Sequence, residues 1–373
     1  MAEPIWAEIN LANIRHNIRE VRRLVGAERE IMAVVKANGY GHGAVQVAKA
    51  VLAAGANRLA VARLCEALTL REAGITAPIL IFGYLSKEQM AQALQQQLTI
   101  TIYRLDMAEQ LAELAQEAGK SVRIHLKVDT GMGRLGFCEG EQGIREIEQI
   151  CSLPGLICEG IYTHFATADE KDKTYTKWQL DRFLSLLHVL EQRGITFPLR
   201  HAANSAAIID FPAAYLDMVR PGIMIYGLYP SAEVEQHKVK LLPAMSLKAR
   251  ITHLKKVTSG TKISYGCTYV TPEDTVIASL PLGYADGYPR LLSSRGQVLI
   301  KGQRAPVVGR VCMDQCMVDV GKIPDVKVHD EVIIFGQGDQ QSLPVEEVAD
   351  WSGTINYEVV CWIGSRVPRF YID

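Results

Sequence analysis

The sequence predicts an α/β fold in which a (β/α)8 barrel of the TIM type is followed by a mostly β C-terminal domain. Up to about residue 230, short β-branched runs alternate with stretches of helical periodicity, as in βαβ units with a parallel sheet. Beyond residue 234 the helical stretches nearly vanish, and strand-like runs are separated by Gly, Pro and Asp. Because the chain has 373 residues, we expect two domains, spanning residues 1–234 and 235–373.

Eight runs in the first part have the length and composition of buried strands. They are Ile31–Val35, Arg58–Ala62, Pro78–Phe82, Leu98–Ile102, Val122–Val128, Cys158–Thr163, Leu199–Ala202 and a strand within Met218–Ile225. The expected helices are Gly43–Ala54, Glu66–Ala73, Lys87–Gln97, Asp106–Ala118, Glu141–Cys151, Tyr175–Arg193 and a short helix after Ser205. Eight such units fit a barrel, which typically needs about 200–250 residues. A doubly wound open sheet is the alternative architecture.

The second part has the pattern of a set of short strands. The expected runs are Leu247–Leu254, Thr275–Pro281, Gln297–Ile300, Ala305–Val311 and Glu331–Phe335. Between the two parts, the segment from Tyr229 to His237 is the expected linker.

The composition excludes several classes of function. With 40 basic and 41 acidic side chains, the net charge of −1 argues against a nucleic-acid surface or a polybasic membrane anchor, so we expect a small-molecule substrate. No apolar run reaches the roughly 18 residues that span a bilayer. The N-terminus carries acids and no basic region typical of a signal peptide, which predicts a cytoplasmic protein. The eight scattered cysteines form no zinc motif, and we expect buried free thiols.

Unusual polar residues follow the ends of the expected strands. They are Lys36 after the first, Arg134 after the fifth, His164 after the sixth, His201, Asn204 and Ser205 after the seventh, and Arg220 and Gly222 at the eighth. In a barrel these positions share the C-terminal rim, where barrel enzymes build their active sites. The sequence therefore predicts one site at this rim.

Lys36 opens the most distinctive local string, Lys-Ala-Asn-Gly-Tyr-Gly-His-Gly, directly after an apolar strand. Desolvation at such a position lowers the pKa of a lysine and makes its amine nucleophilic towards an aldehyde. Taken alone, the lysine is equally compatible with a strand end whose charged head reaches solvent.

The whole string resembles the cofactor-attachment motif of the alanine racemase family. Further blocks resemble that family in the same order along the chain. They are Lys127–Arg134, His201–Ser205, Val219–Ile223, Tyr265-Gly266, Gly283–Gly287, Gly309–Asp314 and Thr354–Glu358. The resemblance covers essentially the whole chain, and it implies a barrel that binds pyridoxal 5′-phosphate (PLP), followed by a β domain.

The resemblance also implies roles for individual residues. Lys36 would hold PLP as a Schiff base and act as one acid/base group, and Tyr265 from the partner chain of a homodimer would be the other. Arg220 would face the pyridine nitrogen of PLP, and His164 would be a further contact of the cofactor. Because a free tyrosine has a pKa near 10, Tyr265 also needs a neighbour that stabilises its phenolate, and His164 and Arg220 are the candidates. The implied phosphate contacts are Tyr40, Ser205, Gly222, Ile223 and Tyr357, with Asn204 beside them.

Four further positions resemble the substrate side of the site. Arg134 would bind the substrate carboxylate or the phenolic oxygen of the cofactor, and the backbone amide of Met313 from the partner chain would help to bind the carboxylate. Lys127 matches a position that is carbamylated in some relatives, and Tyr284 matches the entrance of the site. Without the resemblance, Tyr265 has the features of an ordinary tyrosine of a β domain, and Tyr284 those of an Asp-Gly turn.

The run Gly131–Gly136 fits the G-x-G-x-x-G pattern of dinucleotide-binding proteins. That fingerprint should open a helix directly within the first βαβ unit, whereas this run follows the fifth strand and is separated from the next helix. We therefore interpret the match as accidental.

Together these features predict a PLP-dependent alanine racemase that interconverts L- and D-alanine and supplies D-alanine for the peptidoglycan of the bacterial cell wall. Three alternatives stay open: a serine or broad-specificity amino-acid racemase, a PLP-dependent decarboxylase, and a non-catalytic PLP carrier. A carrier would have no use for the C-terminal domain, and a decarboxylase would not need the blocks at Tyr265 and Met313.

Overall fold

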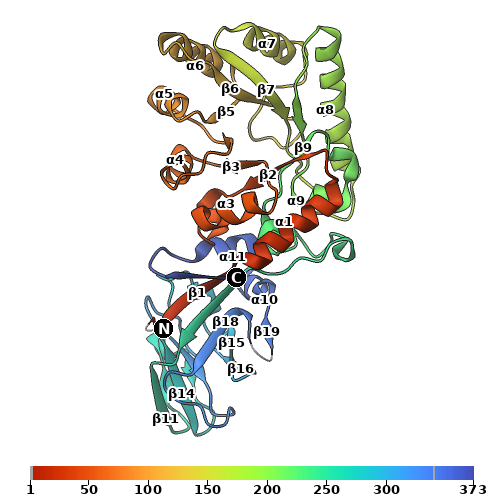
Figure 1. The fold of residues 1–373 in the computed structure, drawn as a ribbon. Coiled ribbons are helices and arrows are strands. Elements are labelled where there is room, and N and C mark those ends of the chain that lie inside the picture. Colours follow the sequence, from red (N-terminus) through yellow and green to blue (C-terminus); the bar gives the residue numbers. More distant parts are fainter. Residues whose placement is uncertain (1–2, 339–340) are drawn as a thin grey trace. The chain divides into compact units, whose positions relative to one another are not determined.

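The computed structural model describes residues 3–338 and 341–373, and it divides them into two compact units (Figure 1). One unit consists of Asn13–Gly39 and Ala44–Leu242. The other consists of the described residues within Met1–Ala12, together with Tyr40–Gly43 and Pro243–Asp373. The domain boundary that we expected between residues 234 and 235 stays a prediction.

The first unit is built on eight parallel strands, which confirms the predicted barrel class. In the order of the sheet they are β8 (Leu199–His201), β7 (Leu156–Tyr162), β6 (Val122–Lys127), β5 (Thr99–Ile102), β4 (Ile79–Ile81), β3 (Arg58–Val61), β2 (Glu30–Val34) and β9 (Met218–Val219). Two hydrogen bonds join the outer strands: Asp217 N donates to the carbonyl of Arg200 at 3.1 Å, and Arg220 N to that of Ala203 at 3.0 Å. The sheet is therefore nearly closed on itself.

Helices connect these strands and lie outside them, as Figure 1 shows for α4 to α7. They are α3 (Ala44–Ala53), α4 (Leu64–Glu72), α5 (Lys87–Gln95), α6 (Leu105–Glu117), α7 (Glu141–Ser152), α8 (Thr174–Gln192) and α9 (Ser205–Asp210). Each of the predicted barrel helices is present with ends shifted by at most a few residues. The local periodicity therefore carried enough information to place them.

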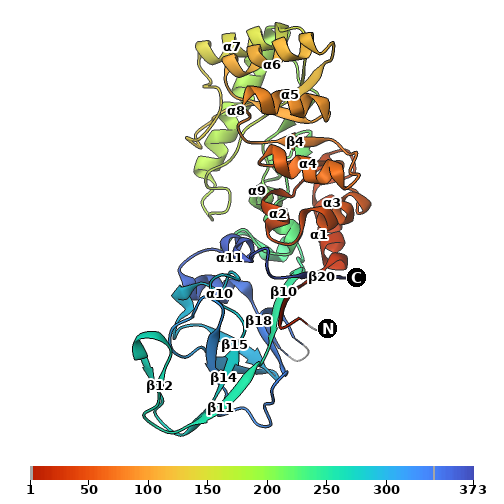
Figure 2. The same ribbon diagram turned by 90° about the vertical axis from the view of Figure 1, so that its left-hand side faces the viewer.

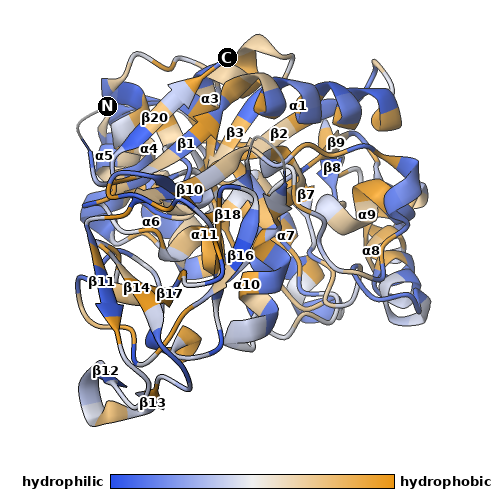
Figure 3. Ribbon diagram, turned by 90° about the horizontal axis from the view of Figure 1, so that it is seen from below, coloured by the Kyte–Doolittle hydropathy of each residue, from blue (hydrophilic) through white to orange (hydrophobic). Residues whose placement is uncertain are grey.

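Two N-terminal elements were not predicted, β1 (Ile5–Asn10) and α1 (Leu11–Val25). Helix α1 buries Ile14, Ile18, Val21 and Val25, which recur at helical spacing along one face. Figure 3 shows hydrophilic and hydrophobic residues alternating along this helix. Strand β1 belongs to the other unit, where it pairs antiparallel with β10 (Met245–Arg250) and parallel with β20 (Arg369–Ile372).

The second unit is mostly β, as predicted. Its largest sheet has the order β16 (Gln303–Pro306), β15 (Gln297–Ile300), β18 (Glu331–Gln337), β10, β1 and β20, with β19 (Ser342–Leu343) paired to β18. A second sheet joins β11 (His253–Val257), β14 (Thr275–Leu280) and β17 (Cys316–Asp319), and β12 (Lys262–Ile263) forms a hairpin with β13 (Tyr269–Val270). The unit also holds α10 (Val345–Ser352) and α11 (Asn356–Trp362), which the sequence analysis did not expect.

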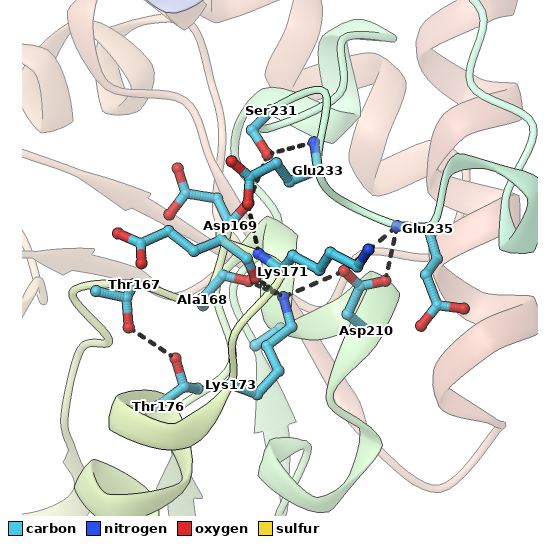
Figure 4. A network of polar contacts seen from close by, with 12 residues as sticks. Thr167, Ala168, Asp169, Lys171, Lys173, Thr176, Asp210, Ser231, Glu233 and Glu235 are labelled. Atoms are coloured by element: carbon cyan, nitrogen blue, oxygen red, sulfur yellow. Dashed lines mark hydrogen bonds and ion pairs between the residues drawn. The ribbon is translucent and has the colours of Figure 1, made fainter.

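Two local expectations need correction. The run Ala305–Val311 is a strand only at its start, because β16 ends at Pro306 and the chain then turns towards β17. The expected linker after Tyr229 is bonded to the barrel unit (Figure 4). Ser231 Oγ donates to the carbonyl of Asp169 at 2.5 Å, and the amide of Glu235 donates to the carboxylate of Asp210 at 3.1 Å. Polar residues in this segment therefore reflect specific bonds and not a loose connection.

Among the described residues, no helix combines the length and the apolar character needed to cross a membrane.

Candidate functional site

Lys36 lies two residues beyond the end of β2 and directly precedes a backbone segment of left-handed helical conformation. The (φ, ψ) angles are 52° and 49° at Ala37, 53° and 46° at Asn38, and 62° and 46° at Gly39. Tyr40 continues the left-handed run with φ 49°. For residues other than glycine this conformation costs about 1–2 kcal/mol each. Strain of this kind, where the surrounding structure holds it, is typical of functional sites.

The carboxylate of Glu66 holds the beginning of this turn. It accepts a hydrogen bond from the amide of Ala37 at 2.5 Å and, at the start of α4, from the amides of Ala62 at 2.8 Å and Arg63 at 3.0 Å. This role of Glu66 was not predicted from the sequence. The available signal was a glutamate three residues after a helix N-cap position, which is the spacing of a capping box.

Arg220, which follows β9, is buried and surrounded by acceptors. Its guanidinium donates to Nδ1 of His201 at 3.0 Å and to the carbonyls of Thr163 at 2.9 Å and Ala202 at 3.1 Å. It also contacts Nδ1 of His164 at 3.3 Å. Burial lowers the pKa of Arg220 to about 10, so the group is still protonated at neutral pH.

His164 lies just after β7, where basic side chains surround it. Burial lowers its pKa well below the usual value, and four positive charges lower it further. These charges belong to Arg220, Arg134, Lys127 and Lys36. The structure therefore brings the predicted rim residues of the barrel into electrostatic range of one neutral imidazole.

Lys127 ends β6 and is buried. Its Nζ donates to the carbonyl of Val128 at 2.5 Å and lies 5.7 Å from the ring centre of Tyr162. Burial lowers the pKa of Lys127 to about 7. The negative charge of Asp129 opposes this shift, and the positive charges of Arg220 and Arg134 add to it. At neutral pH a large fraction of this amine is uncharged.

The glycine-rich loop that carries Arg134 is organised by Asp129. One oxygen of this carboxylate accepts from the amides of Gly131 at 3.0 Å, Met132 at 2.8 Å and Gly133 at 3.1 Å, and the other accepts from the amide of Arg134 at 3.1 Å. These amides point at a side chain of their own loop, which agrees with our interpretation that the G-x-G-x-x-G match is accidental. The Arg134 side chain is exposed.

Asn204 and Ser205 begin α9. The Asn204 side chain caps the helix by accepting from the amide of Ala207 at 3.0 Å. Ser205 Oγ accepts from the amides of Gly222 at 2.8 Å and Met224 at 3.4 Å, next to the short 3-10 helix that Ile223 begins. A hydroxyl and a cluster of backbone amides are thus placed together beyond β8 and β9.

The remaining candidates lie in the second unit. Tyr265 occupies the connection of the β12–β13 hairpin, and 71% of its surface is exposed. Figures 2 and 3 show this hairpin projecting from the rest of its unit. Ser264, which has φ 64°, anchors the connection by donating from Oγ to the carbonyl of Arg310 at 2.7 Å.

Met313 and Tyr284 lie on neighbouring segments and are both exposed. The amide of Ala285 donates to the carbonyl of Met313 at 3.0 Å, and that of Tyr284 to the carbonyl of Cys312 at 3.1 Å. These bonds join the entrance block predicted around Tyr284 to the block that contains Met313.

Tyr40 and Tyr357 face each other within the second unit, with ring centres 6.4 Å apart. Burial raises the pKa of Tyr40 above its usual value, so its hydroxyl stays protonated. The next residue, Gly41, lies so close to Val360 that a Cβ atom would be 2.1 Å from its carbonyl oxygen. This contact explains the glycine in the string after Lys36.

The cysteines correct one expectation. All eight are free, but only Cys316 is buried, and Cys65, Cys138, Cys267 and Cys361 are exposed. In residues 3–338 and 341–373, no group of three or more His, Cys, Asp or Glu side chains is arranged to hold a metal ion.

Comparisons with known proteins agree over the whole chain. Residues 9–230 match the family model described as alanine racemase, N-terminal domain, and residues 244–371 match the alanine racemase, C-terminal domain. The chain is 68% identical over 372 residues to the alanine racemase of Desulforamulus reducens and 53% identical to that of Methanococcus maripaludis, with 100% of each chain covered. The solved alanine racemase of Clostridium difficile 630 is 44% identical, with a TM-score of 0.96, 100% of this chain covered and 96% of the other.

Proposed function

The chain belongs to the alanine racemase family, and from this premise we propose that it interconverts L-alanine and D-alanine with PLP as its cofactor. The observation that carries the proposal is the group of positive charges that act on His164. They come from Arg220, Arg134 and Lys36, and Lys127 adds to them only when it is protonated. Such a group suits a ligand that has phosphate and carboxylate charges and that reacts with a lysine amine at the end of a strand.

The donors of the chain fit PLP. The hydroxyl of Ser205 and the amides near Gly222 and Ile223 are of the kind that binds phosphate. We assign the phosphate to these groups and to the hydroxyls of Tyr40 and Tyr357, with the Asn204 cap supporting Ser205. When bound, PLP delocalises the charge left at Cα after its C–H bond breaks.

Inversion at Cα needs a proton to leave one face and another to arrive at the opposite face. The proposal assigns these transfers to Nζ of Lys36, which also holds the cofactor, and to the phenol oxygen of Tyr265. A single base would mostly return the proton that it had removed. Two bases on opposite faces complete the inversion.

Tyr265 is proposed to serve the barrel of a second copy in a homodimer. Its exposure on a projecting hairpin supports this assignment, because the hydroxyl is accessible to another chain. Val270, Tyr284 and Met313 of the same unit are also large exposed apolar residues, as expected for part of an interface. In the dimer, the Met313 amide would join Arg134 in binding the substrate carboxylate.

Arg220 is proposed to face the pyridine nitrogen of the cofactor. A guanidinium only donates hydrogen bonds, so it holds this nitrogen in the unprotonated form. By holding the nitrogen in this form, Arg220 would limit side reactions such as transamination. His164, held neutral beside Arg220, is the proposed neighbour of the Tyr265 oxygen.

Lys127 is proposed to react with CO₂ and form a carbamate beside Arg134. The reaction requires an uncharged amine, whose nitrogen bonds to the carbon of CO₂ and releases one proton. The pKa of about 7 supports the proposal, as do the nearby positive charges of Arg220 and Arg134, which would stabilise an anion. Native mass spectrometry and ¹³C NMR with labelled bicarbonate should find one adduct per chain that Lys127→Ala abolishes, and absence of the adduct would refute carbamylation.

The central experiment measures exchange of the Cα proton of each alanine enantiomer in D₂O, with added PLP. Wild type should exchange and interconvert both, and Tyr265→Phe should lose exchange from one enantiomer most severely. Borohydride reduction and peptide mapping should label Lys36, and an unlabelled Lys36 peptide would refute the cofactor assignment. Release of CO₂ would identify a decarboxylase. Faster turnover of serine than of alanine would identify a different racemase, and absence of exchange would indicate a carrier.

A complementation experiment tests the shared site. Lys36→Ala and Tyr265→Phe should each abolish most racemisation, but a dimer of the two variants has one site with both groups intact. Mixing after subunit exchange should restore roughly a quarter of wild-type activity, since half of the dimers are mixed and half of their sites are whole. No recovery in verified mixed dimers would place Tyr265 in its own chain's site.

We also propose that the D-alanine product supplies peptidoglycan synthesis in the cytoplasm. Deletion of the gene should make growth depend on added D-alanine, and growth without it would contradict this role unless a second racemase is present.

A further inference from the structure

A row of hydrogen-bonded polar side chains runs through the interior of the barrel from Arg220, and we call this row the file. Its guanidinium donates to Nδ1 of His201 at 3.0 Å. Nε2 of His201 lies 2.9 Å from Nδ1 of His125, and Nε2 of His125 lies 3.2 Å from the carboxylate of Glu159. Both histidines are fully buried. The file therefore joins the arginine of the proposed site to a carboxylate on β7.

The chemistry of its two ends sets the direction of every hydrogen bond in this file. Arginine has no acceptor, so Nδ1 of His201 must accept and the proton of a neutral ring must be on Nε2. That proton is donated to Nδ1 of His125, whose own proton is then on Nε2 and is donated to Glu159. One arrangement of protons satisfies all four groups.

Both imidazoles are neutral in this arrangement. Burial lowers the pKa of His201 well below its usual value, and the positive charge of Arg220 lowers it further. Burial also lowers the pKa of His125, against the opposing effect of Glu159. A neutral ring has one donor and one acceptor, which is what each position in the file requires.

The backbone around Glu159 is shaped for this contact. The register of β6 and β7 pairs Ile124 with Cys158 and His125 with Gly160, so Glu159 is the extra residue of a β-bulge. A bulge redirects side chains near it. At Gly160 a Cβ atom would lie 2.7 Å from the ring of His125, so only glycine leaves room for that ring.

Ion pairs hold the carboxylate at the end of the file. Arg58 contacts Glu159 at 2.8 Å and also pairs with Glu30, and the more exposed Arg123 lies 3.5 Å from the other oxygen. Burial alone would raise the pKa of Glu159, but the bond from His125 and the charge of Arg58 outweigh it and lower the pKa. The acceptor at the end of the file is therefore ionised.

We propose that Glu159, acting through His125, is a positioning residue that holds His201 in the Nε2–H tautomer and so keeps an acceptor facing Arg220. In the other tautomer, His201 would present a donor to a guanidinium that can only donate. Arg220 would lose that acceptor and turn towards its remaining partners. The inference deepens the proposed function, because it concerns how Arg220 is oriented for that role.

The test is histidine ¹⁵N NMR of the full-length protein, with each signal assigned from a variant that lacks that ring. Wild type should show neutral His201 and His125, each protonated at Nε2. Glu159→Leu removes the acceptor and should give mixed tautomers at both rings, whereas Glu159→Gln keeps an acceptor oxygen and should preserve them. Arg123→Ala removes a contact of Glu159 outside the file and is the matched control.

Kinetics supply the second readout. In Glu159→Leu, kcat should fall about tenfold, as expected for loss of one well-formed bond at Arg220, with a smaller change in KM. Glu159→Gln and Arg123→Ala should stay near wild type.

Several results would overturn the inference. The inference would be wrong if His201 in the wild-type protein were protonated at Nδ1 or at both ring nitrogens. This measurement does not depend on whether Glu159→Leu folds. Unchanged tautomers in a folded Glu159→Leu protein would also do so. Since NMR reports tautomers in the absence of turnover, failure of the proposed racemisation would be distinguished from failure of this inference.

Discussion

The backbone amide of Ala37 donates a hydrogen bond to the carboxylate of Glu66, so a side chain at the start of α4 holds the residue next to Lys36. The two residues are far apart in the chain, but β2 and β3 are adjacent parallel strands, and the loops at their C-terminal ends meet. The left-handed turn after Lys36 therefore depends on a neighbouring βα unit.

Removal of this carboxylate should weaken the turn. Glu66→Ala removes three hydrogen bonds, two of them exposed and one half-buried, at a cost of about 0.5–1.5 kcal/mol each. We expect the melting temperature to fall by at least several degrees, at about 2–4 °C per kcal/mol, and the affinity for PLP to fall with it. Glu66→Gln keeps one acceptor oxygen, so its melting temperature should lie between those of wild type and Glu66→Ala. A melting curve of Glu66→Ala that overlays wild type would contradict this role.

Relief of the strain should have the opposite effect. Ala37→Gly removes the Cβ that makes a left-handed conformation unfavourable, a gain of about 1 kcal/mol after the greater freedom of the unfolded glycine is counted. We expect a rise of a few degrees in the melting temperature by calorimetry. Ala91→Gly, in the middle of the regular helix α5, is the control and should lower it. A fall in both variants would show that the turn is not strained.

Asp129 should stabilise the loop of Arg134 in a pH-dependent way. Burial would raise the pKa of its carboxyl, but hydrogen bonds from the amides of Gly131 and Gly133 outweigh burial and lower the pKa below 3.8. Because the folded pKa is the lower one, this stabilisation is complete above pH 3.8 and is lost as pH falls through the folded value.

The measurement compares Asp129→Ala with wild type over this range. The variant should melt at a lower temperature at pH 6, and the difference should shrink below pH 3.8. Asp129→Asn keeps one acceptor oxygen but places an NH₂ group against the amide of Arg134, so we expect a KM for alanine raised several-fold. A constant difference at all pH values would rule out an ionised Asp129 as the cause.

Lys127 should destabilise the protein at low pH. Its pKa is lowered from 10.5 to about 7, so below pH 7 both states carry the proton and the penalty for burying the charge is complete. Between about pH 7 and 10.5 only the unfolded state carries it, so stability rises with pH, by at most about 1.4 kcal/mol per unit.

Lys127→Met removes this charge while it keeps an unbranched side chain. In CO₂-free buffer, its gain in melting temperature over wild type should be largest below pH 7 and should shrink towards pH 10.5. Lys120→Met, at an exposed position, should show no such trend. A gain that grows with pH would have the wrong sign for a buried ammonium group.

Much of the barrel could be predicted from the chain alone, because each strand and helix leaves a local period in the sequence. The positions of Lys36, Arg134, His164 and Arg220 after strands followed from the same map. Strand β1 could not be found in this way, since Ile5–Asn10 pairs with Met245–Arg250, more than two hundred residues later. The role of Glu159 could not be predicted either, because the direction of its side chain is set by a β-bulge and not by the regular alternation of a strand.

By itself, the sequence of this protein determined the class of the fold, the family and the residue types that meet at the rim, because periodicity and motifs are properties of neighbouring residues. The tertiary structure decided which of these side chains are buried, charged or held in a given tautomer. Those properties depend on groups brought together only when the barrel closes, such as Glu66 beside Ala37 and Glu159 beside His125.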